Sequence, residues 1–135
     1  MILNYPAFIT QLEALKTLPK DQSMAVARKA SLDLLTRIVD KTPVKTGRAR
    51  GNWQVDINTT NSNETSGPGR DSIGQGASKI KQFKDYGVLY IFNNVPYILE
   101  LENGKSPQSP PRNMIRGSIL EVEASLSKGL GIGFG

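Results

Sequence analysis

The chain contains no cysteine and no histidine among its 135 residues. Without cysteine it can form no disulfide and has no thiolate nucleophile. Without either residue type, zinc sites of the usual ligand sets and Ser-His or Cys-His catalytic pairs are also excluded. The sequence therefore lacks the groups on which the commonest enzymes depend. We expect that the protein is not an enzyme and that it holds no cofactor or metal.

Long apolar runs are also missing. No stretch approaches the roughly 20 apolar residues that cross a bilayer, and the start MILNYPAFITQLEALK has no basic leader followed by an apolar run. We therefore expect neither membrane insertion nor secretion. A chain of this length can bury one core, so we expect a single domain over residues 1–135.

Basic residues outnumber acidic ones. There are 17 Lys and Arg against 12 Asp and Glu, which gives a net charge of +5. A charge of this sign suits a nucleic acid or an acidic protein partner. It is also common in soluble domains, so it does not select a function by itself.

Helical periodicity predicts helices at about 6–17, 20–41 and 112–128. Pro43 should end the second helix, because it biases Thr42 away from helical torsions. Gly129 should end the third. A shorter helical turn is expected after Pro96, closed by the pair Asn103-Gly104.

Two segments have the pattern of strands. Residues 51–58 alternate between apolar and polar side chains, and residues 88–92 form a continuous apolar run typical of a central strand covered on both faces. The apolar faces of these elements predict one core, made of Leu34, Ile38, Trp53, Val55, Ile57, Leu89, Ile91, Ile119 and Val122.

Three segments are expected to be irregular. Residues 59–79 are rich in Asn, Ser, Thr and Gly, so burial cannot offset the entropy of ordering them, and we predict a long mobile loop. The segment SPQSPP should be extended. The glycine-rich residues 129–135 are expected to form a flexible tail.

The most informative run is TPVKTGRARGNW, residues 42–53, which joins the second helix to the first strand. Its Arg48 and Arg50 should be held on a rigid turn with their heads free. Two interpretations stay open. The arginines are ordinary solvated residues, or their planar guanidinium groups bind a phosphate or the carboxylates of a partner.

Other patterns favour ordinary structural explanations. The run GPGRDSIGQG, residues 67–76, lacks the GK[ST] ending, the preceding strand and the following helix of a phosphate-binding loop. Trp53 is expected in the core and not in a base-stacking platform. Solvated charge is the expected role of four glutamates, Glu100, Glu102, Glu121 and Glu123.

Taken together, TPVKTGRARGNW, then NNVPYILELENGKSPQSP and a closing helix near Asn113-Met114 resemble the head-to-tail joining family of tail-completion proteins from tailed bacteriophages. The resemblance covers residues 42–53 and 93–116. It implies an α+β fold, in which a small antiparallel or mixed sheet packs against N-terminal and C-terminal helices. It also implies a structural, tail-terminator-like neck protein of the virion, assembled in the host cytoplasm.

The same resemblance implies the partners. The chain would form a hexameric ring between the head connector and the tail tube, with genomic DNA passing through the lumen without sequence-specific binding. By that analogy, the loop 59–79 would reach a neighbouring subunit or the tail tube. Five residues become candidates for subunit contacts or for the lumen, namely Thr46, Arg48, Arg50, Arg70 and Lys79.

A second function of another class stays open. A small basic module could bind nucleic acid through cations spread over the second half of the helix-to-strand turn and the polar loop, namely Arg48, Arg50, Arg70, Lys79, Lys81 and Lys84. The two functions differ in their response to salt, because binding to phosphates weakens steeply as salt is added.

Overall fold

The computed structural model describes residues 17–84 and 87–130. In chain order these contain α2 (Lys20–Lys41), α3 (Arg48–Gly51), β1 (Trp53–Ile57), α4 (Ser72–Lys81), β2 (Leu89–Asn93), α5 (Ile98–Asn103) and α6 (Met114–Leu130). Within this part of the chain the fold is α+β, with one two-stranded antiparallel sheet. The predicted fold class is confirmed. The predicted helix at 6–17 lies outside the described residues apart from Thr17, and so do residues 131–135 of the predicted tail.

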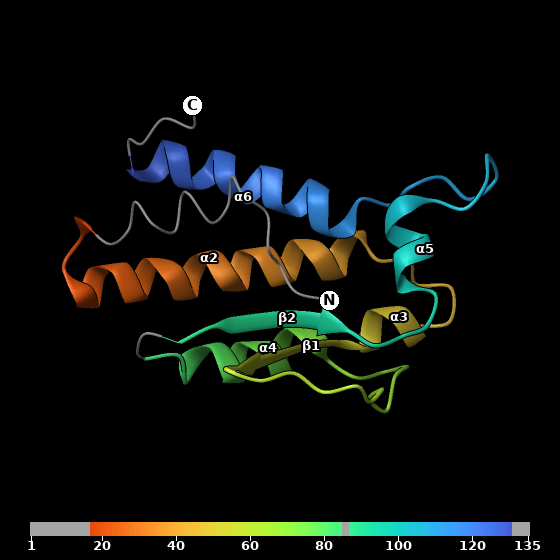
Figure 1. Ribbon diagram of the computed structural model, residues 1–135, viewed down its shortest axis with the longest axis horizontal. Helices are drawn as coiled ribbons and strands as arrows, with labels where there is room; N and C mark the ends of the chain where they lie inside the picture. The colour runs from red at the N-terminus through yellow and green to blue at the C-terminus, as the bar shows by residue number, and fades with distance from the viewer. Residues whose placement is uncertain (1–16, 85–86, 131–135) are drawn as a thin grey trace.

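The helix α2 is the centre of the arrangement. It packs against α6 on one side and against α4 on the other, and α4 also packs against β1 (Figure 1). The helix ends as predicted, because Thr42 before Pro43 adopts extended torsions with ψ at 129°. Its Leu34, Leu35 and Ile38 are almost fully buried.

The sheet pairs β1 with β2 in the register Trp53 opposite Asn93 and Ile57 opposite Leu89. The prediction that residues 88–92 form a central strand is wrong for the described chain, because β2 has only β1 beside it. Ile91 and Phe92 point to opposite faces and both are 1% exposed. The continuous apolar run therefore reflects cover on both faces of a strand that lies at an edge.

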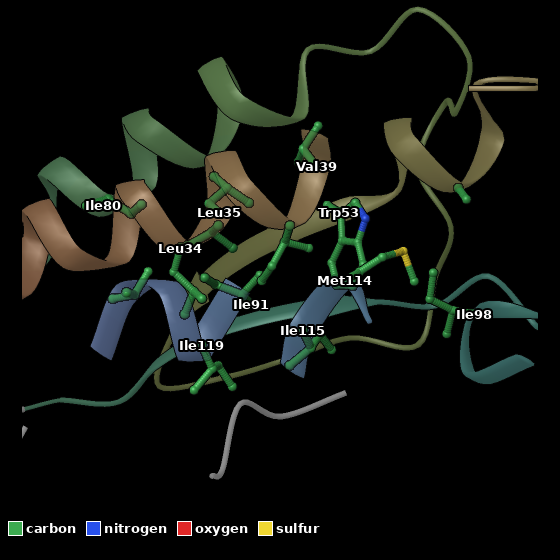
Figure 2. Packing of buried hydrophobic residues seen from close by; sticks show 14 of the residues in the cluster. Leu34, Leu35, Val39, Trp53, Ile80, Ile91, Ile98, Met114, Ile115 and Ile119 are labelled. Carbon is green, nitrogen blue, oxygen red and sulfur yellow. The ribbon is translucent and has the colours of Figure 1, made fainter. Parts of the chain in front are cut away.

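The core lies where α2, α6, α4 and the sheet meet (Figure 2). Of the nine residues predicted for it, Leu34, Ile38, Trp53, Val55, Ile91, Ile119 and Val122 are buried there. Leu89 is partly buried and packs against the cluster. Ile57 is also partly exposed and is not part of the cluster, so its prediction is wrong.

The segment predicted as a loop contains a helix. Residues 58–71 have no helix or strand, but α4 occupies Ser72–Lys81. Asp71 caps α4 by accepting the backbone N–H of Gly74 at 2.9 Å. Gly76 allows a close approach, since a Cβ there would lie 2.3 Å from Leu35 Cδ2. Gly76, one of the glycines that suggested a loop, is thus needed for packing.

Two further predictions near the C-terminus are wrong. The segment SPQSPP is not extended throughout, because Ser106 and Ser109 pair across a tight turn with Pro107 at its second position. The helix α6 does not stop before Gly129 but runs to Leu130. A helix tolerates a glycine in its last turn at a cost of about 1 kcal/mol. The predicted turn after Pro96 is confirmed as α5, and Gly104 ends it with φ at +82°.

Candidate functional site

The motif residues meet at one end of the molecule, where α2 ends and β1 begins. We call this region the junction, defined as residues 42–53 and 93–97 with the loop 58–71. The first and last residues of TPVKTGRARGNW bond to each other there. The Thr42 hydroxyl donates to the carbonyl oxygen of Ile38 at 2.7 Å and accepts the indole N–H of Trp53 at 2.8 Å. The spacing of the motif therefore fastens the end of a helix to the start of a strand.

Arg50 closes the same helix end. Its Nε donates to the carbonyl oxygen of Thr42 at 3.2 Å, and its Nη2 donates to that of Asp40 at 3.2 Å. The last carbonyls of a helix have no intrahelical donor and carry partial negative charge, so a cation suits them. The expectation of a free head is wrong for Arg50.

Arg48 forms a bidentate pair with a carboxylate of its own chain. Its Nε and Nη2 donate to the two carboxylate oxygens of Glu64, each at 2.8 Å. The guanidinium also lies 5.4 Å from the centre of the Tyr97 ring, within the range of a cation–π contact. Hydrogen bonding to Arg48 lowers the pKa of Glu64. The carboxylate that Arg48 binds belongs to its own chain and not to a partner, so its head is not free as expected.

Arg70 lies behind the junction and is directed at backbone oxygens. Its Nη1 donates to the carbonyl oxygens of Trp53 at 2.8 Å and Gly51 at 3.1 Å. It also lies 3.2 Å from Ser72 Oγ, which itself donates to the carbonyl oxygen of Arg50 at 2.7 Å. Burial lowers the pKa of Arg70. This arginine thus joins α3, β1 and the start of α4.

Side-chain amides hold the polar loop against the junction. Asn52 is fully buried, and its Oδ1 accepts the backbone N–H of Thr65 at 2.7 Å. The Thr65 hydroxyl donates to the carbonyl oxygen of Gly51 at 2.7 Å. Directly after β2, the Asn94 amide donates to the carbonyl oxygens of Asn61 and Asn63, both at 2.8 Å.

The polar composition that predicted a mobile loop therefore provides its attachments. Each such bond contributes on the order of 1 kcal/mol, which offsets part of the entropy of ordering. The mobility of the free subunit stays a prediction, and hydrogen exchange on the free and assembled chain tests it.

Polar side chains of the second motif, residues 93–110, also bond to backbone groups of the same chain. Asn93 is buried, with its amide donating to the carbonyl oxygen of Ala49 at 2.9 Å and its Oδ1 accepting the N–H of Val95 at 3.0 Å. Glu102 is 5% exposed, and its two oxygens accept the first N–H groups of α6, those of Ile115 at 3.0 Å and Arg116 at 3.1 Å. The prediction of a solvated Glu102 is wrong. A buried carboxylate at a helix N-terminus is stabilised by the unpaired N–H groups and the helix dipole.

Comparison with protein families gives one match. The model described as "HK97-gp10_like: Bacteriophage HK97-gp10, putative tail-component" matches residues 7–104, well over half of the chain. This chain belongs to that family. Comparisons with curated proteins and with solved structures found no match. Membership of the HK97-gp10-like family confirms the resemblance to phage tail-completion proteins. The match includes the first motif whole and the second as far as Gly104, and it ends before α6 begins.

Four of the five candidate residues lie at the junction of this HK97-gp10-like chain. Thr46 is exposed, and its Oγ1 accepts the backbone N–H of Arg48 at 3.2 Å. Lys79 is the exception, since it lies on α4 beside Asp56, with Nζ 3.6 Å from its Oδ1. The structure therefore separates Lys79 from the three arginines, whose guanidinium groups all bond within the chain.

Sequence reasoning missed the exposed surface that the junction carries. Every residue from 105 to 113 is exposed, and we call this segment the arm. Its base is fixed, because Gly104 N–H donates to Glu100 at 2.8 Å and Arg112 N–H donates to Leu101 at 2.9 Å, each to the carbonyl oxygen. Beside the arm, Leu99 is 58% exposed. The cluster of prolines in SPQSPP was the one signal that could have indicated a projecting turn.

Within residues 17–84 and 87–130, no group of three or more Asp or Glu residues has the arrangement of a metal site. In the same residues, no helix has the length and apolar character that crossing a bilayer requires. Glu123, which was also predicted to be solvated, is buried as well, at 8% exposure, so that prediction is wrong.

Proposed function

We propose that this tail component is a structural subunit of the phage neck. In this proposal it forms a ring, as a hexamer, that completes or terminates the tail and joins it to the head connector, with DNA passing through the lumen. Family membership supports a structural part of the virion tail. The composition supports a role other than catalysis, since cysteine and histidine, and with them Ser-His and Cys-His pairs, are missing.

The observation that carries the proposal is a rigid junction with an exposed arm. The guanidinium groups of the motif bond internally, as described above, so they fix the shape of this end of the molecule. Two large apolar side chains are exposed here, Val44 at 62% in the turn after α2 and Leu99 at 58% on α5. Exposed apolar side chains on a rigid frame are typical of protein contacts. We assign this end to the adjacent neck, connector or tail-tube protein.

The candidate residues act indirectly in this proposal. Arg48 and Arg50 position the turn that carries Val44 and Thr46, and they do not themselves pair with a neighbouring subunit. Arg70 supports the same turn from behind. This differs from the expectation of intersubunit carboxylate pairs, because each guanidinium already has acceptors in its own chain.

The nucleic-acid alternative loses support from the same contacts. Of its six cations, the three arginines are bonded within the junction, and Lys79 faces Asp56. The other two members of that set, Lys81 and Lys84, are exposed and line a groove that also contains Asp21. Such a small charge suits passage of DNA better than tight binding to it.

The test uses charged substitutions at the exposed apolar positions. Val44→Asp and Leu99→Asp are introduced together, and the phage gene is complemented with the variant. Exposed substitutions should leave the unfolding curve close to wild type. Joined infectious particles should fall by about 100-fold, because charges at an apolar contact cost several kcal/mol. Val88→Asp is the matched control, since Val88 is also an exposed valine, at 50%, but lies at the far end of β2.

Microscopy and size measurement complete the test. Tailless heads beside free tails are expected if the chain joins the two, and tails of abnormal length if it terminates the tail. Normal particles from the double variant would overturn the assignment of this end. A purified chain that stays monomeric and binds duplex DNA with a steep salt dependence would instead favour the nucleic-acid module.

A further inference from the structure

A second side of α6 is left open beside the side that faces the core. Leu120, Glu123, Ala124 and Ser127 recur at spacings of three and four, so they share one face of the helix. They line a shallow hollow with Lys128 at its end. Leu120 is 64% exposed, the most exposed of the large apolar side chains described. The small side chains of Ala124 and Ser127 would let another surface come close. We call these four residues the α6 face.

Glu123 on this face has a buried carboxylate oxygen without a hydrogen-bond partner. The residue is 8% exposed, yet its Oε1 has no hydrogen-bond partner in the structure. Burial accordingly raises the pKa of its carboxyl group. Burying a carboxylate without a partner is unfavourable unless a cation or a donor arrives from elsewhere. The other glutamate on this stretch of helix, Glu121, is already paired with Lys41 and Arg37 of α2.

A groove lined mainly by cations lies where α2 meets α4. It is formed by the first half of α2 and the end of α4, and its lining residues are Lys20, Asp21, Met24, Arg28, Lys81 and Lys84. Four cations and one carboxylate thus surround a methionine. Arg28 is fixed in place, since its Nη1 donates to the carbonyl oxygen of Phe83 at 2.8 Å. We call this the basic groove.

We propose that these two surfaces meet between neighbouring copies of the chain, with the α6 face of one copy seated in the basic groove of the next. Leu120 then packs against Met24, and the carboxylate of Glu123 meets the ammonium groups of Lys81 and Lys84. The carboxylate of Glu123 suits the excess of cations in the basic groove, and each surface includes an apolar side chain, Leu120 in one and Met24 in the other.

The placement of the surfaces favours a ring. Helix α2 packs between α6, which carries the α6 face, and α4, whose end lines the basic groove (Figure 1). A contact between two different surfaces is head-to-tail, and such contacts form a ring when the rotation between neighbours closes and a filament when it does not. This inference rests on the proposed ring and adds which surfaces hold it together, separately from the end of the molecule assigned to the next neck protein.

Cysteine cross-linking tests the contact directly, because the natural chain has no cysteine of its own. The double variant Leu120→Cys with Met24→Cys is assembled, oxidised and treated in parallel with a short bifunctional thiol reagent. We expect a ladder of covalent multimers ending at the ring, which reduction removes from the oxidised sample. Leu120→Cys with Val88→Cys is the matched control pair, and the single variants complete the set.

A charge exchange provides the second measurement. Glu123→Lys should weaken self-association by about tenfold or more, because it places like charges at the contact. Combining it with Lys81→Glu and Lys84→Glu should restore association. Each variant's unfolding curve is recorded, so that a folding defect is recognised.

The outcomes separate this inference from the proposed function. Rings that form normally but give no ladder from the Leu120–Met24 pair overturn the inference and leave the ring intact. Cross-linking of Leu120→Cys to itself would show a two-fold contact and also overturn it. A chain that stays monomeric under all conditions overturns the ring proposal, and this inference with it.

Discussion

Replacing Thr42 with valine removes one hydroxyl oxygen and keeps the volume and branching of the side chain. In the folded chain that oxygen accepts the indole N–H of Trp53 and donates to the carbonyl oxygen of Ile38, with a weaker contact to Met114 Sδ at 3.3 Å. The backbone N–H of Thr42 is bonded to Val39 and does not replace the hydroxyl at Ile38. Thr42→Val therefore leaves one donor and one acceptor without their partner.

Neither orphaned group can turn to water, since Thr42 is 1% exposed and Trp53 is 0% exposed. A buried polar group without a partner costs about 1–3 kcal/mol. Thr42→Val should accordingly lower the free energy of unfolding by about 2–4 kcal/mol. Thr42→Ser is the control, because it keeps the oxygen and loses one methyl group, at a cost of about 1 kcal/mol.

The assay is urea unfolding followed by far-UV circular dichroism. Fluorescence of Trp53, the single tryptophan of the chain, should report the changed surroundings of the indole. In a Trp53→Phe background the Thr42→Val change should cost about 1–2 kcal/mol less, because the orphaned N–H is then absent. If Thr42→Val proves as stable as Thr42→Ser, this hydroxyl does not hold the helix end to the strand, and the reasoning fails.

Three further predictions concern other parts of the fold. Gly51→Ala should destabilise by about 1–3 kcal/mol in urea unfolding, because a Cβ would lie 1.9 Å from the carbonyl oxygen of Gly67, whereas Gly129→Ala, with nothing within 4 Å, should not. Glu102→Gln should cost about 1–2 kcal/mol, since the amide keeps one acceptor for the two N–H groups at the start of α6, and an unchanged midpoint would contradict this. Two cations of α2 lower the pKa of Glu121 from its ordinary 4.5, so its contribution is complete above that value and is lost as pH falls below it. The small stability difference between wild type and Glu121→Gln should therefore shrink in acid, and a difference that grows there would contradict the pairing.

The sequence predicted those elements whose apolar residues follow a clear period. The long stripe of α2, the alternation of β1 and the apolar face of α6 were each recognised within a few residues. The helix α4 was missed because its signal is weak in sequence. Ile73 and Ile80 are two turns apart, and two glycines lie between them. Only the packed structure shows that Gly76 is needed where α4 meets Leu35 and Val55.

The sequence could not predict the contacts of the candidate residues, whose role as a site stays a prediction. The sequence identified the turn with Arg48 and Arg50 and the preference of a guanidinium for carboxylates. It could not show that Glu64 is the carboxylate, because that pair depends on the path of an irregular loop. Buried carboxylates were missed for a similar reason. Glu102 and Glu123 stand at positions where an exposed glutamate is the rule, and only the packing of α5 and α6 buries them.

The residues that identify the family are thus different from those to which we assign its contacts. Thr42, Arg50 and Trp53 are used inside the junction, where each satisfies a backbone or side-chain group of the same chain. Such residues fix the fold and the direction in which the arm projects. They cannot also bind a neighbour without breaking those bonds. In our proposal, recognition of partners depends instead on exposed side chains such as Leu99, which lies within the second motif, and Leu120, which lies outside both motifs.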